Sequence, residues 1–299
     1  MAVRFFLICS IILAVALAAV DSPAEDGEPP NGLVALLTDY GADSIYAGTL
    51  KGAIYAKDRS VTPVSISHSV PPFDVVTGAY MLVEAAAMYP AGTVFCAVVD
   101  PGVGTERRQV AVKTGGGLYF VGPDNGLLAL AAERFGLAEA RELTNEALWR
   151  DGAVSHTFHG RDIFGPVAAS LAGGAPFEDV GPVVDPETLQ ELPIEAPKVE
   201  DGVAHGAVVR VDAYGNVVTN LTAEHLEALG LSLGDTAEAA IGGAPLEAVY
   251  VRTYGEVGEG EPLMLIQSMG LVEFALNLGD LAAETGAEAQ APVTVSKMD

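Results

Sequence analysis

Residues 98–108 read Val-Val-Asp-Pro-Gly-Val-Gly-Thr-Glu-Arg-Arg. The apolar run from Thr93 to Val99 predicts a buried strand, and the Pro-Gly-x-Gly sequence after it predicts a tight turn. Ligands of open α/β sheets bind at the carboxyl ends of the strands, so a carboxylate at that point is a candidate site residue. Asp100 is therefore the first candidate functional residue of the chain.

Four other stretches also place a polar cluster beside an apolar segment. They are Leu36-Leu37-Thr38-Asp39-Tyr40-Gly41, Phe120-Val121-Gly122-Pro123-Asp124-Asn125-Gly126, Ser155-His156-Thr157-Phe158-His159-Gly160-Arg161-Asp162 and Val209-Arg210-Val211-Asp212-Ala213-Tyr214-Gly215-Asn216. Taken alone, each has an ordinary structural interpretation. Asp39 could cap a helix, the Asp124 segment could cap a helix starting at Leu127, and Asp212 with Asn216 could form a simple turn.

Strand and helix patterns alternate over the first two thirds of the chain, which predicts an α/β domain with a Rossmann-like layered sheet over residues 32–185. Apolar runs predict strands at Leu33 to Leu37, Val61 to Ser67, Thr93 to Val99, and a hairpin of Gln109 to Thr114 with Leu118 to Val121. Helical spacing predicts helices at Tyr46 to Ala56, Asp74 to about Met88, Leu127 to Phe135 and Asp162 to Leu171.

A Pro-rich and acidic stretch from Gly173 to Glu200 indicates a domain boundary. Short β-like runs separated by Gly-rich turns follow it, which favours a small all-β barrel or sandwich over residues 200–299. These runs are Gly206 to Val211, Val217 to Leu221, Ala237 to Ile241, Leu246 to Thr253, Pro262 to Gln267 and Val272 to Leu276.

The amino-terminal segment has the pattern of a secretory signal peptide over residues 1–20. Arg4 precedes an apolar run from Phe5 to Val20 that contains the small-x-small sequence Ala16-Leu17-Ala18. Residues 21–31 are acidic and Pro-rich, which predicts a disordered leader. The chain is thus expected to be secreted or periplasmic. An uncleaved membrane anchor or an incorrectly assigned start, with a cytoplasmic chain, is the alternative, and no other apolar run is long enough to span a bilayer.

Charge and cysteine content exclude several classes of partner. The net charge is -25 with only 15 Lys plus Arg, which argues against nucleic acids and anionic membranes. Cys9 lies in the predicted signal peptide, so Cys96 is alone and neither an intrachain disulfide nor a cysteine metal site is expected in the mature chain. No phosphate-binding or dinucleotide fingerprint is present, and His156 with His159 lacks further ligands, so no metal and no cofactor are predicted.

Together these motifs resemble the S-adenosyl-L-methionine hydroxide adenosyltransferases, which are relatives of the fluorinases and chlorinases. The resemblance rests on Thr-Asp-Tyr-Gly, Val-Asp-Pro-Gly-Val-Gly-Thr, Pro-Asp-Asn-Gly-Leu, Thr-Phe-His-Gly-Arg-Asp-Ile-Phe and Asp-x-x-Gly-Asn-x-x-Thr-Asn, in this order between Leu33 and Leu278. It implies an α/β domain followed by a β-barrel domain. It also implies a homotrimer in which each active site lies between the amino-terminal domain of one subunit and the barrel of its neighbour.

The resemblance further implies hydrolysis of S-adenosyl-L-methionine to adenosine and L-methionine without a cofactor. The residues that would prepare the water are Asp100, Arg107 and His159. Those that would hold the substrate are Asp39 at the ribose, Asp212, Asn216 and Ser268 at the methionine end, and Asn277 near adenine. In this scheme His159 can take the proton of the water, Asp100 can orient His159 or the water, and Arg107 would keep Asp100 ionised. The sequence does not decide which of the three residues takes the proton. A structural ion pair at a strand end is the competing interpretation of the trio.

Two alternative functions remain open at this stage. A halogenase is one, although fluorinases lack the aspartate of Asp-Pro-Gly-Val-Gly and carry a serine where this chain has Gly160. A secreted, non-catalytic module that binds the nucleoside is the other. The leader supports the latter because S-adenosyl-L-methionine is made in the cytoplasm, whereas the intact trio Asp100, Arg107 and His159 argues against it.

Overall fold

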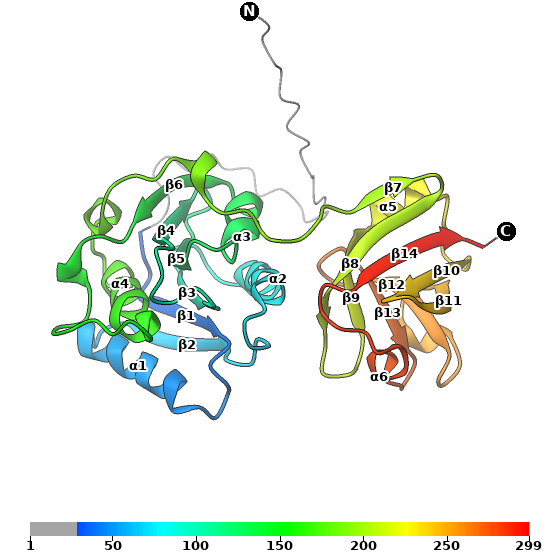
Figure 1. Ribbon diagram of the computed structural model, residues 1–299, viewed down its shortest axis with the longest axis horizontal. Coiled ribbons are helices and arrows are strands. Elements are labelled where there is room, and N and C mark those ends of the chain that lie inside the picture. Colours follow the sequence, from blue (N-terminus) through cyan, green and yellow to red (C-terminus); the bar gives the residue numbers. More distant parts are fainter. Residues whose placement is uncertain (1–28, 299) are drawn as a thin grey trace, which may run out of the picture. The chain divides into compact units, whose positions relative to one another are not determined.

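The computed structural model describes residues 29–298, which form two compact units that meet in the sequence between Pro193 and Ile194 (Figure 1). The predicted signal peptide, and all but the last three residues of the predicted leader, lie outside the described residues. Within the described range, no helix is long and apolar enough to cross a membrane.

The amino-terminal unit contains a mixed sheet of six strands in the order β2-β1-β3-β5-β4-β6. The strands are β1 (Leu33–Thr38), β2 (Thr62–Ser67), β3 (Val94–Val98), β4 (Gln109–Thr114), β5 (Tyr119–Pro123) and β6 (Leu137–Glu142). The first four in this order are parallel, and β4 runs antiparallel to both β5 and β6. The α/β prediction is confirmed, although β6 was not predicted.

Helices cover both faces of this sheet, as Figure 1 shows. They are α1 (Ile45–Lys57), α2 (Val75–Ala86), α3 (Ala129–Arg134) and α4 (Gly165–Ala172). Because side chains alternate across a strand, β1 buries Val34 and Leu36 in the core under α1 and α4, and buries Leu37 in the core under α2 and α3. The helix predicted to begin at Asp162 instead begins as a π-helical turn, Gly160–Phe164, which leads into α4.

The sheet brings two candidate carboxylates to one edge. Strands β1 and β3 are parallel neighbours in which Thr38 pairs with Val98. Asp39 follows β1 directly and Asp100 follows β3 by two residues, so both lie at the carboxyl ends of adjacent strands. This is the edge at which open α/β sheets bind ligands.

The carboxyl-terminal unit is a closed barrel, which settles the choice between barrel and sandwich. Its strands are β7 (Lys198–Glu200), β8 (Val203–Val211), β9 (Val217–Thr222), β10 (Thr236–Ile241), β11 (Ala244–Tyr250), β12 (Pro262–Ile266), β13 (Leu271–Leu276) and β14 (Pro292–Lys297). Seven strands, in the order β14-β10-β11-β12-β13-β9-β8, close through pairing of β14 with β8, and β7 adds to β8 outside the ring. Two short helices, α5 (Ala223–Ala228) and α6 (Leu281–Thr285), complete the unit.

Candidate active site

A bidentate ion pair joins the two charged residues that flank the turn after β3. Arg107 donates from Nε to Asp100 Oδ1 at 2.8 Å and from Nη2 to Asp100 Oδ2. The exposed fractions of the two side chains are 10% and 6%, so the pair is largely removed from water. Hydrogen bonds within the turn, from Val103 N to Asp100 O and from Thr105 Oγ1 to Gly102 O, hold the loop that carries both residues.

His159 lies on the other side of the same guanidinium. Arg107 Nη2 is 3.0 Å from His159 Nδ1, so Arg107 bridges Asp100 and His159. The two loops approach closely because residue 104 is glycine: a Cβ there would lie 2.3 Å from the carbonyl oxygen of His156, and φ at Gly104 is +78°. The structure thus brings together the three residues predicted to prepare the water.

The bridge fixes the proton on the imidazole. A guanidinium can only donate, so Nδ1 of His159 is the acceptor and the neutral ring carries its proton on Nε2. Burial, followed by the positive charge of Arg107, lowers the pKa of His159, which keeps the ring neutral at pH 7. Nε2 then presents a hydrogen-bond donor. This geometry does not fit the sequence-based role of His159 as a base oriented by Asp100, because Arg107 stands between the two.

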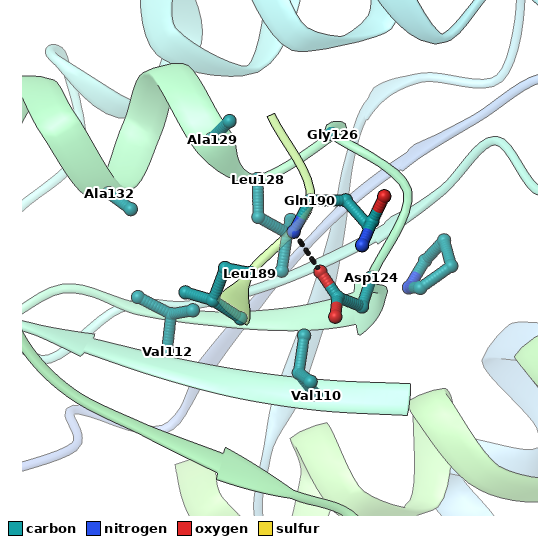
Figure 2. Close-up of a pocket in the computed structure, with 10 residues that line it drawn as sticks. Val110, Val112, Asp124, Gly126, Leu128, Ala129, Ala132, Leu189 and Gln190 are labelled. Atoms are coloured by element: carbon teal, nitrogen blue, oxygen red, sulfur yellow. Dashed lines mark hydrogen bonds between the residues drawn. The ribbon is translucent and has the colours of Figure 1, made fainter. Parts of the chain in front are cut away.

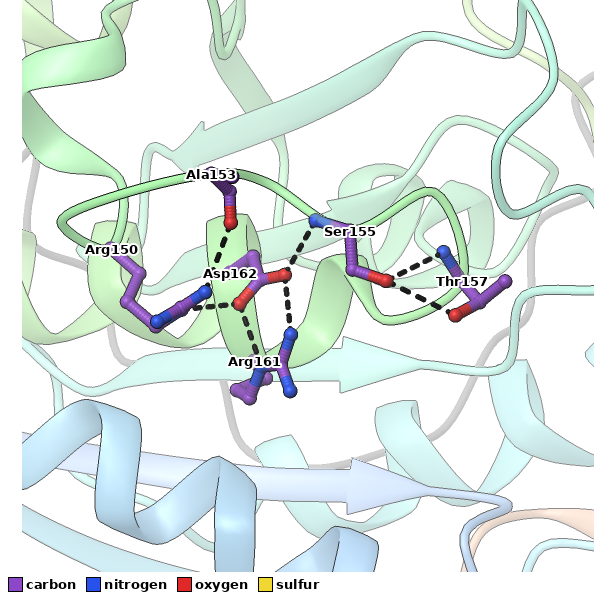
Figure 3. Close-up of polar contacts among 6 residues, drawn as sticks. All are labelled: Arg150, Ala153, Ser155, Thr157, Arg161 and Asp162. Carbon is purple, nitrogen blue, oxygen red and sulfur yellow. Dashed lines mark hydrogen bonds and ion pairs between the residues drawn. The ribbon is translucent and has the colours of Figure 1, made fainter.

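The loop before His159 is fastened by one buried carboxylate, as Figure 3 shows. Asp162 has no exposed side-chain surface and accepts from Arg150 Nε at 2.5 Å, from Arg161 Nε and Nη2 at 2.7 and 2.8 Å, and from Ser155 N at 2.8 Å. Burial alone would raise the pKa of Asp162, but the hydrogen bonds from Arg161, Ser155 and Arg150 lower it to about 2. No sequence pattern predicted this role of Asp162.

Asp39 retains one open oxygen at the same sheet edge. Its Oδ2 accepts from the backbone N of Phe73 at 3.0 Å, and no residue among 29–298 hydrogen-bonds Oδ1. Phe73 has a φ of +67° and an exposed fraction of 70%. Strained, exposed residues of this kind cluster at ligand clamps. The arrangement is compatible with the predicted contact of Asp39 with a ribose hydroxyl.

His68, which directly follows β2, lies beside Thr38, the residue before Asp39. Its Nδ1 is 2.9 Å from Thr38 Oγ1 and its Nε2 is 2.9 Å from Ser65 Oγ, so it links the ends of β1 and β2. Burial and the nearby Lys51 charge lower the pKa of His68. Its position at the carboxyl end of a strand, like that of Asp39, was the available signal.

Asp124 fastens the segment that leads out of the amino-terminal unit. Figure 2 shows its Oδ1 accepting from Gln190 N, at 2.8 Å, and Arg108 Nε donates to Oδ2 at 2.8 Å. Arg108 also holds Thr188 through its hydroxyl and its carbonyl. The neighbouring Asn125 donates to Val99 O at 2.9 Å, at the strand end before Asp100, and accepts from Leu127 N. Helix α3 begins at Ala129 after Leu128 and has no side-chain cap, so the expectation that the Asp124 segment caps a helix starting at Leu127 is wrong.

In the carboxyl-terminal unit, the Asp212 carboxylate is engaged within its own turn. It accepts from the backbone N of Tyr214 at 2.8 Å and from the backbone N and Nδ2 of Asn216, each at 3.0 Å. The turn interpretation of this motif is therefore realised. A ligand of Asp212 and Asn216 would have to bind the acceptor positions that these hydrogen bonds do not occupy, which include the amide oxygen of Asn216.

The other two predicted contacts, Ser268 and Asn277, lie at opposite ends of β13. Asn277 follows the strand and donates from Nδ2 to Val257 O at 2.8 Å, so it holds a loop of the barrel. Ser268 lies in the turn before β13, where its hydroxyl contacts Gln267 Oε1 at 3.3 Å. Val217 pairs with Phe274, which places the Asp212 turn near the Asn277 end. Ser268 lies at the opposite end of β13, about one strand length (roughly 15–20 Å) from that end.

Comparison with known proteins agrees with both units. The family model described as SAM hydroxide adenosyltransferase N-terminal domain matches residues 34–181, and the model for the C-terminal domain matches residues 206–294. An (R)-S-adenosyl-L-methionine hydrolase of Salinispora tropica is 42% identical over 85% of this chain and 93% of its own length. The corresponding protein of Thermus thermophilus is 38% identical over 87% and 98%.

More distant relatives and solved structures extend the comparison. A fluorinase of Actinoplanes sp. is 28% identical over 90% of this chain and 99% of its own length. The crystal structure of an uncharacterized conserved protein from Thermotoga maritima superposes with a TM-score of 0.82 at 37% identity, covering 88% of this chain and 99% of that one. With both domain models matched in order over most of the described residues, the chain belongs to the SAM hydroxide adenosyltransferase family.

Proposed function

We propose that this chain hydrolyses S-adenosyl-L-methionine to adenosine and L-methionine, by in-line attack of water on the 5′ carbon. The observation that carries the proposal is the Arg107 guanidinium, which holds Asp100 and His159 together at the ligand-binding edge of the sheet. The 42% identity to a protein named as an (R)-S-adenosyl-L-methionine hydrolase supports the same substrate, in the (R) configuration that this name specifies.

The leaving group determines what the site must supply. The 5′ carbon bears a sulfonium, so the breaking C–S bond gives its electron pair to sulfur and methionine leaves as a neutral thioether that needs no proton. The enzyme must therefore orient a nucleophile opposite sulfur and shield it from bulk water. Two of the three side chains that we assign to this task, Asp100 and Arg107, are largely shielded from solvent.

The tautomer of His159 determines how the water is handled. The Nε2–H group donates to the water oxygen and fixes one of its lone pairs, which leaves the other lone pair for the 5′ carbon. As the C–O bond forms, the O–H protons of the attacking water become strongly acidic, and even a weak base can take one of them. Asp100 is that base in our proposal, with the free lone pairs of its carboxylate as acceptors, while Arg107 balances its charge.

Oxygen-18 water tests the reaction. The purified chain from about Asp21 onward would be incubated with S-adenosyl-L-methionine, in either configuration at sulfur, in labelled water containing chloride, and the products analysed by mass spectrometry. We expect adenosine with the label in its 5′ hydroxyl. A 5′-chloro nucleoside would instead indicate a halogenase. Bound nucleoside without product would leave only the binding-module hypothesis.

The assembly and the export of the chain belong to the same proposal. The family resemblance supports a homotrimer, and light scattering on the mature chain would detect three chains per particle. The Arg4, Phe5 to Val20 and Ala16-Leu17-Ala18 pattern supports cleavage of a signal peptide. Mass spectrometry of the exported protein would place the new amino terminus near Asp21, whereas an intact Met1 would contradict export with cleavage.

A further inference from the structure

Tyr40 is held rigidly beside the three residues that we assign to the water. It follows Asp39 at the end of β1, and its backbone N donates to Thr38 Oγ1 at 3.2 Å. Its ring meets the edges of two other aromatic rings, Tyr46 at 6.3 Å and Phe158 at 5.5 Å between centroids. Phe158 directly precedes His159, so this aromatic cluster ties Tyr40 to the loop that carries the imidazole.

The hydroxyl of Tyr40 occupies the space where a side chain at residue 160 would lie. A Cβ on Gly160 would be 2.1 Å from Tyr40 Oη and 3.2 Å from Cζ. Such a distance is far below van der Waals contact, so a larger residue at this position would force the Tyr40 ring or the backbone at residue 160 to shift. Because Gly160 follows His159 directly, Tyr40 Oη lies against the backbone next to the imidazole.

This hydroxyl has no hydrogen-bond partner in the part of the chain that the structure describes. Half-buried tyrosine hydroxyls usually find one. Over residues 29–298, the only fully enclosed polar side-chain atom without a partner is Nε1 of Trp149. The Tyr40 hydroxyl is therefore not sealed off, and a water can reach it. Because this hydroxyl is unpartnered, open to water and adjacent to His159, a water or substrate atom in the site can hydrogen-bond it.

The charge environment keeps this group a neutral phenol. Burial raises the pKa of Tyr40 well above its usual range, and the nearby Cys96, Asp39 and Asp100 act in the same direction against the smaller effect of Arg107. A neutral phenol donates and accepts hydrogen bonds but does not act as a base near pH 7. The Tyr40 hydroxyl can therefore orient a reacting water but does not deprotonate it.

We propose that Tyr40 is a further catalytic residue, whose hydroxyl hydrogen-bonds the attacking water beside His159. This role rests on the proposed function. With it, all four positions around the water oxygen are assigned. One lone pair accepts from His159 Nε2–H, the other faces the 5′ carbon, one O–H points to Asp100 and the second O–H points to Tyr40 Oη.

Tyr40→Phe tests this role because it removes only the hydroxyl and keeps the ring in its aromatic cluster. Steady-state release of adenosine would give kcat and KM, and a urea titration would give the unfolding midpoint. Loss of one such hydrogen bond predicts a fall in kcat of about tenfold, with KM within about twofold of wild type. The unfolding midpoint should not change. Tyr46→Phe removes a hydroxyl from the same cluster at an exposed position and should leave kcat within about twofold.

Gly160→Ala in the two backgrounds tests the contact itself. In the wild-type background the new methyl group meets Tyr40 Oη at 2.1 Å, and activity should fall sharply. In the Tyr40→Phe background the nearest ring atom is at 3.2 Å, so the same substitution should reduce activity several-fold less. Equal losses in the two backgrounds would overturn the placement of the hydroxyl.

The outcomes separate this inference from the proposed function. An active wild type together with a Tyr40→Phe variant of unchanged kcat would overturn the role of Tyr40 alone. A lower unfolding midpoint in step with the lower kcat would also overturn it, by making the hydroxyl structural. A wild-type chain that releases no adenosine would overturn the proposed function and this role with it.

Discussion

Replacing Asp162 with asparagine should destabilise the amino-terminal unit while changing almost no volume. The carboxylate accepts hydrogen bonds from two arginines and from the backbone N of Ser155, and its side chain has no exposed surface. An asparagine would present an NH₂ group among these donors. Each carboxylate oxygen accepts from two of these donors, so whichever oxygen is replaced, the NH₂ group would face two donors and both of their hydrogen bonds would be lost. The bonds to the remaining carbonyl oxygen would be weakened by the loss of the charge.

The lowered pKa of Asp162 gives the size of the effect. A carboxyl whose pKa falls from 3.8 to about 2 on folding contributes about 2–2.5 kcal/mol above pH 5. The exposed fractions of Arg150 and Arg161 are 38% and 29%, so water can solvate both guanidinium groups once the charge is gone. We therefore expect Asp162→Asn to lower the free energy of unfolding by about 2–3 kcal/mol, less than when a fully buried partner is stranded.

The lowered pKa of Asp162 also determines how the free energy of unfolding depends on pH. Because folding depresses the pKa of Asp162, its contribution is complete above the unfolded value of 3.8 and disappears as the pH falls toward 2. The difference between wild type and Asp162→Asn should be largest above pH 5. It should shrink steadily between about pH 4 and pH 2.

Trp149 provides the assay. It is the single tryptophan of the 299-residue chain and neighbours Arg150, so its fluorescence in urea reports the unit that contains Asp162. Glu139→Gln is the matched control, because Glu139 pairs with Arg141 in the same unit but is 33% exposed, and its loss should cost below about 1 kcal/mol. An Asp162→Asn variant within about 0.5 kcal/mol of wild type, or a difference that does not change with pH, would refute the reasoning.

Three further predictions concern the catalytic loops. Asp100→Ala and His159→Ala should each lower turnover at least about a hundredfold and leave adenosine binding, measured by calorimetry, nearly unchanged; parallel loss of binding would contradict their assignment. The pKa of His159 is lowered, so kcat should stay level from pH 8 to below pH 6.5. It should fall only when protonation of Nδ1 breaks the hydrogen bond from Arg107. A fall of kcat centred above pH 6.5 would contradict the assigned tautomer. Gly104→Ala should destabilise the chain by about 1–3 kcal/mol in urea, because of its positive φ and the missing space, and an unchanged midpoint would contradict the close approach of the loops.

Local patterns were sufficient to predict the elements that are apolar along their whole length. Strands β1 and β3 are buried over nearly every residue. The predicted start of α2 at Asp74 is confirmed, since the Asp74 carboxylate accepts from Thr77 N at 2.9 Å and caps the helix. The unpredicted β6 has the sequence Leu-Ala-Glu-Ala-Arg-Glu and lies at a sheet edge, where polar residues remain in water and no apolar run develops. The unpredicted β14 is defined by its distant partners β8 and β10.

The candidate site shows the same division. Motifs located Asp100, Arg107 and His159, since each belongs to a short stretch of characteristic composition. The motifs could not predict which of these residues contact one another. Arg107 lies between Asp100 and His159 because of the way in which two loops pack at Gly104. The hydroxyl of Tyr40 was missed for the same reason, because its significance comes from Gly160, 120 positions later in the numbering.

The closure of the barrel by β14 makes the order of synthesis matter. The amino-terminal unit has all of its strands once Glu142 has been made, and its connecting segment ends at Pro193, so it can complete its fold while the rest is being translated. The barrel cannot, because β8 waits for Pro292–Lys297 to pair with it. Until residues 292–297 emerge, the edges of β8 and β10 lack their last partner, a state open to wrong pairing. A ribosome that stalls before Pro292 is made would therefore carry one finished unit and one open sheet.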